Sequence, residues 1–142
     1  MTHFLVLSLA ASTLLFGSVD EVRERLQRRD FLAALTIAER DLKATPSSAV
    51  LWTLKGFALD GLNRRAEALT ALRTAHRLQP AFVPTLQALA QMEYASGDAG
   101  ARSSLEQLLR LRPDLPEAHA MLGVLAFERN DCPAAAAYFA KG

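Results

Sequence analysis

Few side chains in this sequence have a type and spacing that would support catalysis. The histidines are His3, His76 and His119, and none has an acid or a nucleophile beside it at a useful spacing. Cys132 is the single cysteine, and we expect it to pack as a small apolar residue. The sequence therefore predicts packing or solvated roles for these side chains and no enzyme activity.

Motifs for metals, cofactors and phosphates are also missing. One thiol, with no CxxC or Cys/His ligand spacing, does not predict a metal site. The segment GDAGA at residues 97–101 lacks the Gly-Lys-Ser/Thr ending and the preceding strand of a phosphate loop, so it predicts a turn between helices. We expect no cofactor and no bound metal.

The composition is typical of a helical globular protein. Apolar residues make up 51% of the chain and charged residues 22%, and the abundant Leu and Ala are strong helix formers. The net charge is +1, and acids interleave with bases between Asp20 and Asp30. Because nucleic-acid binding needs a clustered basic face, we expect no nucleic-acid partner.

Residues 1–17 are predicted to be a signal peptide or an N-terminal anchor. Residues 4–16 carry no charge, and as a helix they would span about 20 Å, short of the roughly 30 Å core of a bilayer. That length favours the apolar part of a secretory signal peptide, with small Gly17 and Ser18 near the cleavage site. An uncleaved membrane anchor, or an apolar helix packed on the domain that follows, stays open. The expected location is periplasmic or secreted, or membrane-anchored if the segment is not cleaved.

The rest of the sequence repeats itself. Residues 32–46 align with residues 66–80, so that Pro46 falls on Pro80 at an offset of 34 residues. The next such proline is Pro113, after 33 residues. A period of this length is typical of stacked helix pairs.

The pattern resembles the tetratricopeptide repeat, which reads W-x2-L-G-x2-Y, then A-x3-F, then P. The second repeat matches at Trp52, Gly56, Ala68, Leu72, Ala75 and Pro80. The fourth repeat matches at Leu122, Gly123, Ala135 and Phe139, with His119 in the place of Trp52. The resemblance covers residues 18–142. It implies an all-α, right-handed solenoid with repeats at about 18–48, 49–82, 83–115 and an incomplete 116–142.

Apolar periodicity predicts the helices independently. They are expected at about 19–28, 31–44, 49–61, 64–78, 83–96, 98–111, 115–129 and from 132 onward. The residues expected to cap their N-termini are Ser18, Asp30, Ser48, Asn63, Asp98, Asp114 and Asp131. Asp114 and Glu117 are also expected to form a capping box.

The resemblance further implies a binding groove. In this family the first helix of each pair lines a concave surface that binds extended peptides or partner helices. Here those positions are Phe57, Asp60, Gln87, Gln91, Tyr94, Val124, Phe127 and Glu128. The Lys/Asn clamp that some members use for a C-terminal carboxylate is missing, so an acidic-tailed partner is not expected. Packing of Phe57, Val124 and Phe127 between helices is the alternative.

The sequence favours a scaffold that binds a protein or peptide and is exported to the bacterial envelope. Since the chain stops inside its last predicted helix, a second hypothesis is a substrate-recruiting arm of a larger enzyme, with its catalytic domain beyond residue 142. A third is an assembly subunit that the uncleaved N-terminal segment holds in the membrane. Membrane contact is expected only through that segment.

Overall fold

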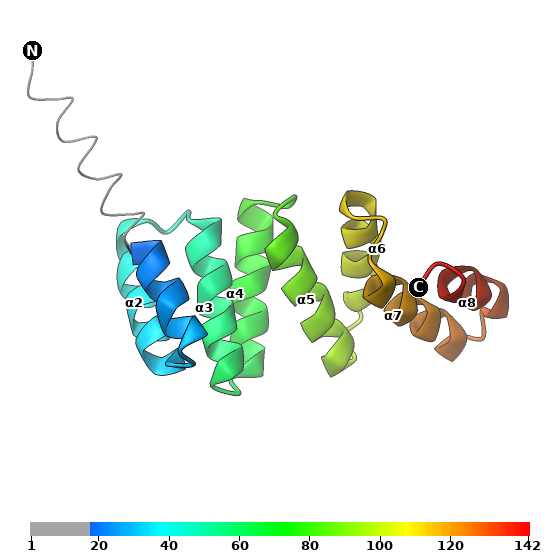
Figure 1. Ribbon diagram of the computed structural model, residues 1–142, viewed down its shortest axis with the longest axis horizontal. Helices are drawn as coiled ribbons and strands as arrows, with labels where there is room; N and C mark the ends of the chain where they lie inside the picture. Colours follow the sequence, from blue (N-terminus) through cyan, green and yellow to red (C-terminus); the bar gives the residue numbers. More distant parts are fainter. Residues whose placement is uncertain (1–17) are drawn as a thin grey trace, which may run out of the picture. The chain divides into compact units, whose positions relative to one another are not determined.

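The computed structural model describes residues 18–142, and this part of the chain is helical throughout (Figure 1). A helix over residues 18–27 is followed by α2 (Phe31–Ala44), α3 (Ala49–Gly61), α4 (Arg65–Leu78), α5 (Val83–Ser96), α6 (Ala101–Leu111), α7 (Pro116–Glu128) and α8 (Cys132–Phe139). The expected all-α fold of consecutive helix pairs is confirmed. The signal peptide or anchor predicted at residues 1–17 lies outside the described residues. None of the helices described in 18–142 is long and apolar enough to cross a bilayer.

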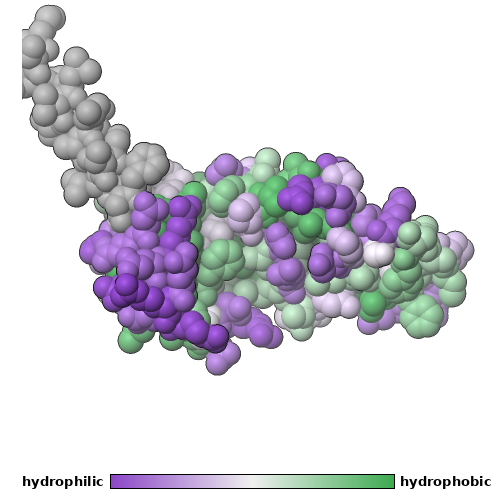
Figure 2. Space-filling view, in the orientation of Figure 1, coloured by the Kyte–Doolittle hydropathy of each residue, from purple (hydrophilic) through white to green (hydrophobic). Residues whose placement is uncertain are grey.

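The helices form two compact units. The first ends at Gln79 and contains α2, α3 and α4, in which α3 packs against both α2 and α4. The second begins at Pro80 and contains the pairs α5–α6 and α7–α8. Packing of α6 against α7 connects the two pairs. Hydrophilic residues cover the helix over residues 18–27, whereas apolar residues gather over α8 (Figure 2).

Three of the predicted N-caps are confirmed by their hydrogen bonds. The side chains of Asp30, Ser48 and Asp131 accept from the amides of Ala33, Leu51 and Ala134 at 3.3, 3.3 and 3.1 Å. Each bond satisfies one of the backbone donors that a helix start leaves free. Ser18 is the first described residue and lies in its helix, so its expected capping role stays a prediction.

The turn inside each pair explains why Asn63 does not cap α4. One residue with positive φ stands in each turn: Arg29 (59°), Asn63 (59°), Gly97 (68°) and Asn130 (60°). Gly and Asn adopt this left-handed conformation at low cost. Asn63 is therefore the turn residue, and Arg64 becomes the N-cap of α4 without a side-chain hydrogen bond.

The caps expected at Asp98 and Asp114 are also wrong. Oδ1 of Asp98 accepts from the amide of Gly100 at 2.8 Å, which closes a local turn and delays the start of α6 to Ala101. Asp114 accepts from Nε of Arg112 at 3.3 Å, and α7 begins after Leu115 with no side-chain cap. The capping box of Asp114 with Glu117 is therefore absent.

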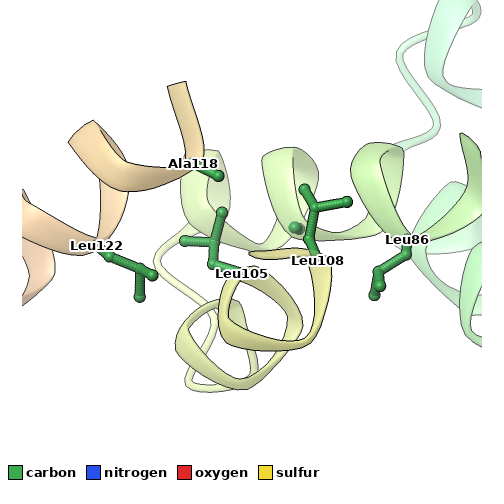
Figure 3. Packing of buried hydrophobic residues seen from close by; sticks show 6 residues of the cluster. Leu86, Leu105, Leu108, Ala118 and Leu122 are labelled. Carbon is green, nitrogen blue, oxygen red and sulfur yellow. The ribbon is translucent and has the colours of Figure 1, made fainter. Parts of the chain in front are cut away.

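The core of the second unit joins three helices. It consists of Leu86 and Ala90 from α5, Leu105 and Leu108 from α6, and Ala118 and Leu122 from α7, each at most 3% exposed. Figure 3 shows these side chains between the three helices. Because α6 lies against both α5 and α7, this core holds the first helices of two consecutive pairs in place around it.

Candidate functional site

A narrow cleft lies in the second unit, where α5, α6 and α7 meet. Its walls are Gln87, Gln91, Leu105, Leu108, Leu115, Glu117, Ala118 and Met121, and the cavity volume between them is about 10 Å³, room for about one water molecule. Leu105, Leu108 and Ala118 belong to the buried core. The cleft therefore has an apolar floor, and its polar groups stand at the exposed rim.

The position of these side chains follows from the core pattern of their helices. In α5, Gln87 and Gln91 are one turn apart, and each directly follows a core residue. In α7, Glu117 and Met121 are also one turn apart, and each directly precedes a core residue. The two stripes thus border the same core, which is why they line a single cleft.

Three polar side chains of the cleft have no partner inside the described part of the protein. Gln87, Gln91 and Glu117 are exposed, and none of them forms a hydrogen bond or ion pair with residues 18–142. A glutamine amide both donates and accepts, whereas an ionised carboxylate only accepts. The rim consequently offers free donors and acceptors to a ligand that rests on the apolar floor.

Two basic side chains of α6 and its following loop, Arg102 and Arg112, are paired with acids, whereas Arg110 lines a different hollow and has no partner among the described residues. Arg102 donates to Glu106 at 2.8 Å, and this hydrogen bond raises the pKa of Arg102. The backbone amide of Asp114, followed by the guanidinium of Arg112, holds the pKa of Asp114 below its usual range. Since α5 and α7 contain no Lys or Arg, the formal charge of the cleft walls is the negative charge of Glu117.

The structure brings together only part of the predicted groove. Gln87 and Gln91 share the cleft. Tyr94 is half-buried and packs against the core cluster, so it also has a structural role. On α7, Val124 is half-buried and Phe127 is 65% exposed, which does not fit packing of Phe127 between helices.

The remaining predicted groove residues lie at helix ends or in the first unit. Glu128 is exposed at the last position of α7. Phe57 on α3 is 36% exposed, and Oδ1 of Asp60 lies 3.8 Å from Nε of Arg65. A binding role for the eight residues stays a prediction.

Six of the eight cleft residues are not among the predicted groove residues: three belong to the buried core, and the other three are Leu115, Glu117 and Met121. Glu117 was expected to serve a capping box that the structure does not contain. The spacing of one turn between Glu117 and Met121, the same as between Gln87 and Gln91, was the available signal.

A second hollow, lined by α6, α7, α8 and the residues that follow them, contains His119. Its walls also include Arg110, Tyr138 and Lys141. Nε2 of His119 lies 2.9 Å from the carbonyl oxygen of Pro113, and Nδ1 is buried without a partner. Within residues 18–142, no three His, Cys, Asp or Glu side chains gather as metal ligands would.

Comparisons with solved structures identify the fold. The crystal structure of MamA superposes with a TM-score of 0.81 at 16% sequence identity, covering 89% of this chain and 75% of that one. TTC0263, a thermophilic TPR protein in Thermus thermophilus, superposes with a TM-score of 0.63 at 24% sequence identity. The match covers 84% of this chain and 68% of the TTC0263 chain. The first TPR of Spaghetti (RPAP3), bound to an HSP90 peptide SRMEEVD, superposes with a TM-score of 0.73 at 18% sequence identity. The match covers 82% of this chain and 95% of that one.

These matches confirm at the level of fold the resemblance to tetratricopeptide repeats: consecutive helix pairs over most of the chain. No protein-family model matches the sequence, and no curated protein matches it. The fold therefore rests on the structure, and function has to be argued from the cleft itself.

Proposed function

We propose that this protein is a non-enzymatic scaffold that binds an extended peptide or protein segment in the cleft between α5 and α7. The observation that carries the proposal is the set of unpartnered side chains, Gln87, Gln91 and Glu117, above an apolar floor. Free amides can pair with the backbone of an extended chain, and an apolar side chain of that chain can rest against the apolar surface beside them. The peptide-bound Spaghetti repeat, which has the same fold, supports a ligand of this class.

The test is a selection from a library of random peptides. Binding by the unmodified protein is compared with binding by Gln87→Ala/Gln91→Ala. The matched control is Gln27→Ala/Gln79→Ala, which removes two exposed amides outside the cleft. We expect the control to retain the enriched peptides and the cleft variant to lose them, with unchanged helical circular dichroism. Equal retention by both variants would place the binding surface elsewhere.

We further propose that this scaffold works outside the cytoplasm. The uncharged run at residues 4–16, followed by small Gly17 and Ser18, supports a cleaved leader. Mass spectrometry of the intact protein from its native cells tests this. A mature chain that starts at or near Ser18 is expected, and a mass that includes residues 1–17 would contradict it.

A further inference from the structure

The charges of α7 narrow the chemistry of the ligand. Building on the proposed function, we propose that the cleft selects an extended segment in which two basic residues flank an apolar one. The segment would lie along a stripe of α7 made of Glu117, Met121, Val124 and Glu128. These residues stand at i, i+4, i+7 and i+11, which places them on one face of the helix.

Both carboxylates of this stripe lack a partner within the described residues. The other five acidic side chains of the second unit each have one: Glu93 with Ser104, Asp98 with Gly100, Glu106 with Arg102, Asp114 with Arg112, and Asp131 with Ala134. Glu117 and Glu128 are exposed and form no hydrogen bond or ion pair with residues 18–142. Glu117 and Glu128 are thus the acidic side chains of the unit without a hydrogen-bond or ion-pair partner among the described residues, and they lie at the two ends of one helix face.

The middle of the stripe is apolar. Met121 lines the cleft, Val124 is half-buried, and Phe127 stands beside the stripe with 65% of its surface exposed. An apolar side chain of the ligand can therefore rest on this surface between the two carboxylates. An acidic segment would instead meet the like charge of both carboxylates; α5 and α7 contain no Lys or Arg, and Arg129 follows directly after α7.

The length of the stripe sets the spacing of the basic residues. The eleven residue-to-residue steps from Glu117 to Glu128 span about 16 Å at about 1.5 Å per step. An extended chain rises about 3.3 Å per residue, so basic residues about five positions apart match the two carboxylates. Gln87 and Gln91 lie across the cleft and can pair with the backbone of such a segment.

The experiment measures the affinity of labelled synthetic peptides by fluorescence anisotropy. The first peptide has two lysines five positions apart with a leucine between them, the second has glutamates for the lysines, and the third has the lysines two positions apart. We expect the first to bind best, and its affinity to fall as salt is raised because exposed charges are screened.

We expect Glu117→Gln and Glu128→Gln each to lower the affinity for the first peptide by about two- to fivefold, the range expected for exposed ion pairs. The control is Glu24→Gln on the helix over residues 18–27, which changes the net charge equally. Equal loss in all three variants, or tighter binding of the glutamate peptide, would refute the charge assignment.

Failure of this proposal is distinguishable from failure of the proposed function. If the random library yields acidic or neutral peptides that Gln87→Ala/Gln91→Ala loses, the cleft binds peptides and only the charge assignment is wrong. If no peptide binds, both proposals fail. A second copy of this chain could also occupy the cleft, and sedimentation analysis tests this. If the unmodified protein is a dimer and the double variant Glu117→Gln/Glu128→Gln is a monomer, the ligand is a second copy of the chain. That result would overturn the basic-peptide assignment.

Discussion

His119 takes over a specific hydrogen bond as well as the position of an aromatic residue. Nε1 of Trp52 donates to the carbonyl oxygen of Pro46 at 2.8 Å, and Nε2 of His119 lies 2.9 Å from the carbonyl oxygen of Pro113. Since a carbonyl oxygen only accepts, Nε2 carries the proton in this bond. Histidine in place of the tryptophan of the second repeat therefore preserves a hydrogen bond. This bond joins the first helix of the repeat to the loop before it.

The cost of the substitution is the buried, unpartnered Nδ1 of His119. We predict that His119→Trp stabilises the protein by about 1 kcal/mol, because an indole keeps the donor and removes the unsatisfied atom. The adjacent hollow beside Tyr138 gives the larger ring room. Urea unfolding measures the change, and His119→Phe is the control that removes the donor. A Trp variant no more stable than the Phe variant would show that the hydrogen bond does not matter.

Arg29 is the exception among the four turn residues with positive φ, because it is neither Gly nor Asn. The left-handed conformation costs an ordinary residue roughly 1–2 kcal/mol. We predict that Arg29→Gly raises the free energy of unfolding by about 0.5–1 kcal/mol, less than the full strain, since the exposed contact of the Arg29 guanidinium with the Phe31 ring at 5.9 Å is lost. Gly97→Ala, the converse change, should lower thermal stability. A destabilised Arg29→Gly protein would contradict this assignment of strain.

At the scale of elements, Gly56 sets how closely α3 and α4 approach. A Cβ at this position would lie 2.8 Å from Cγ of Leu72, whose side chain is fully buried. We predict that Gly56→Ala destabilises the protein by about 1 kcal/mol, because overpacking outweighs the better helix propensity of Ala. A double-mutant cycle with Leu72→Ala measured by urea unfolding tests the contact. Additive effects would show that the two positions do not interact.

Most helix boundaries could be predicted from the sequence because the repeat period and the apolar stripes fix them. The helix predicted at 98–111 begins later because Gly97 and Asp98 form a turn of their own. Side chains that can cap a helix can also close a turn, and sequence spacing alone does not decide between these uses.

The cleft was predictable only in part for a related reason. Gln87 and Gln91 stand at expected groove positions, but the role of Glu117 depends on which residue caps α7. Because Asp114 pairs with Arg112, Leu115 becomes the N-cap and no capping box engages Glu117. The choice of Asp114 between pairing with Arg112 and capping α7 therefore determines whether the Glu117 carboxylate is free for a ligand.

At the scale of the whole molecule, each helix pair is stabilised mainly by its neighbours, so stability should vary along the chain. In the second unit, α8 has a single buried residue, Ala135, whereas α5 contributes Leu86, Leu89, Ala90 and others to the interior. We predict that the amide hydrogens of α8 exchange with solvent faster than those of α5. Hydrogen-exchange mass spectrometry measures this, and equal protection of both helices would mean that the unit opens only as a whole.

The distribution of aromatic residues gives the molecule two separate optical reporters. The single tryptophan, Trp52, lies in α3 of the first unit, and its ring is held by the bond to Pro46 and by Nζ of Lys55 at 5.2 Å. Both tyrosines, Tyr94 and Tyr138, lie in the second unit and pack against its core. Excitation that selects the indole therefore follows the first unit, while phenol absorbance follows the second. One unlabelled sample can thus reveal whether a ligand, a substitution or a denaturant acts on both halves or on one.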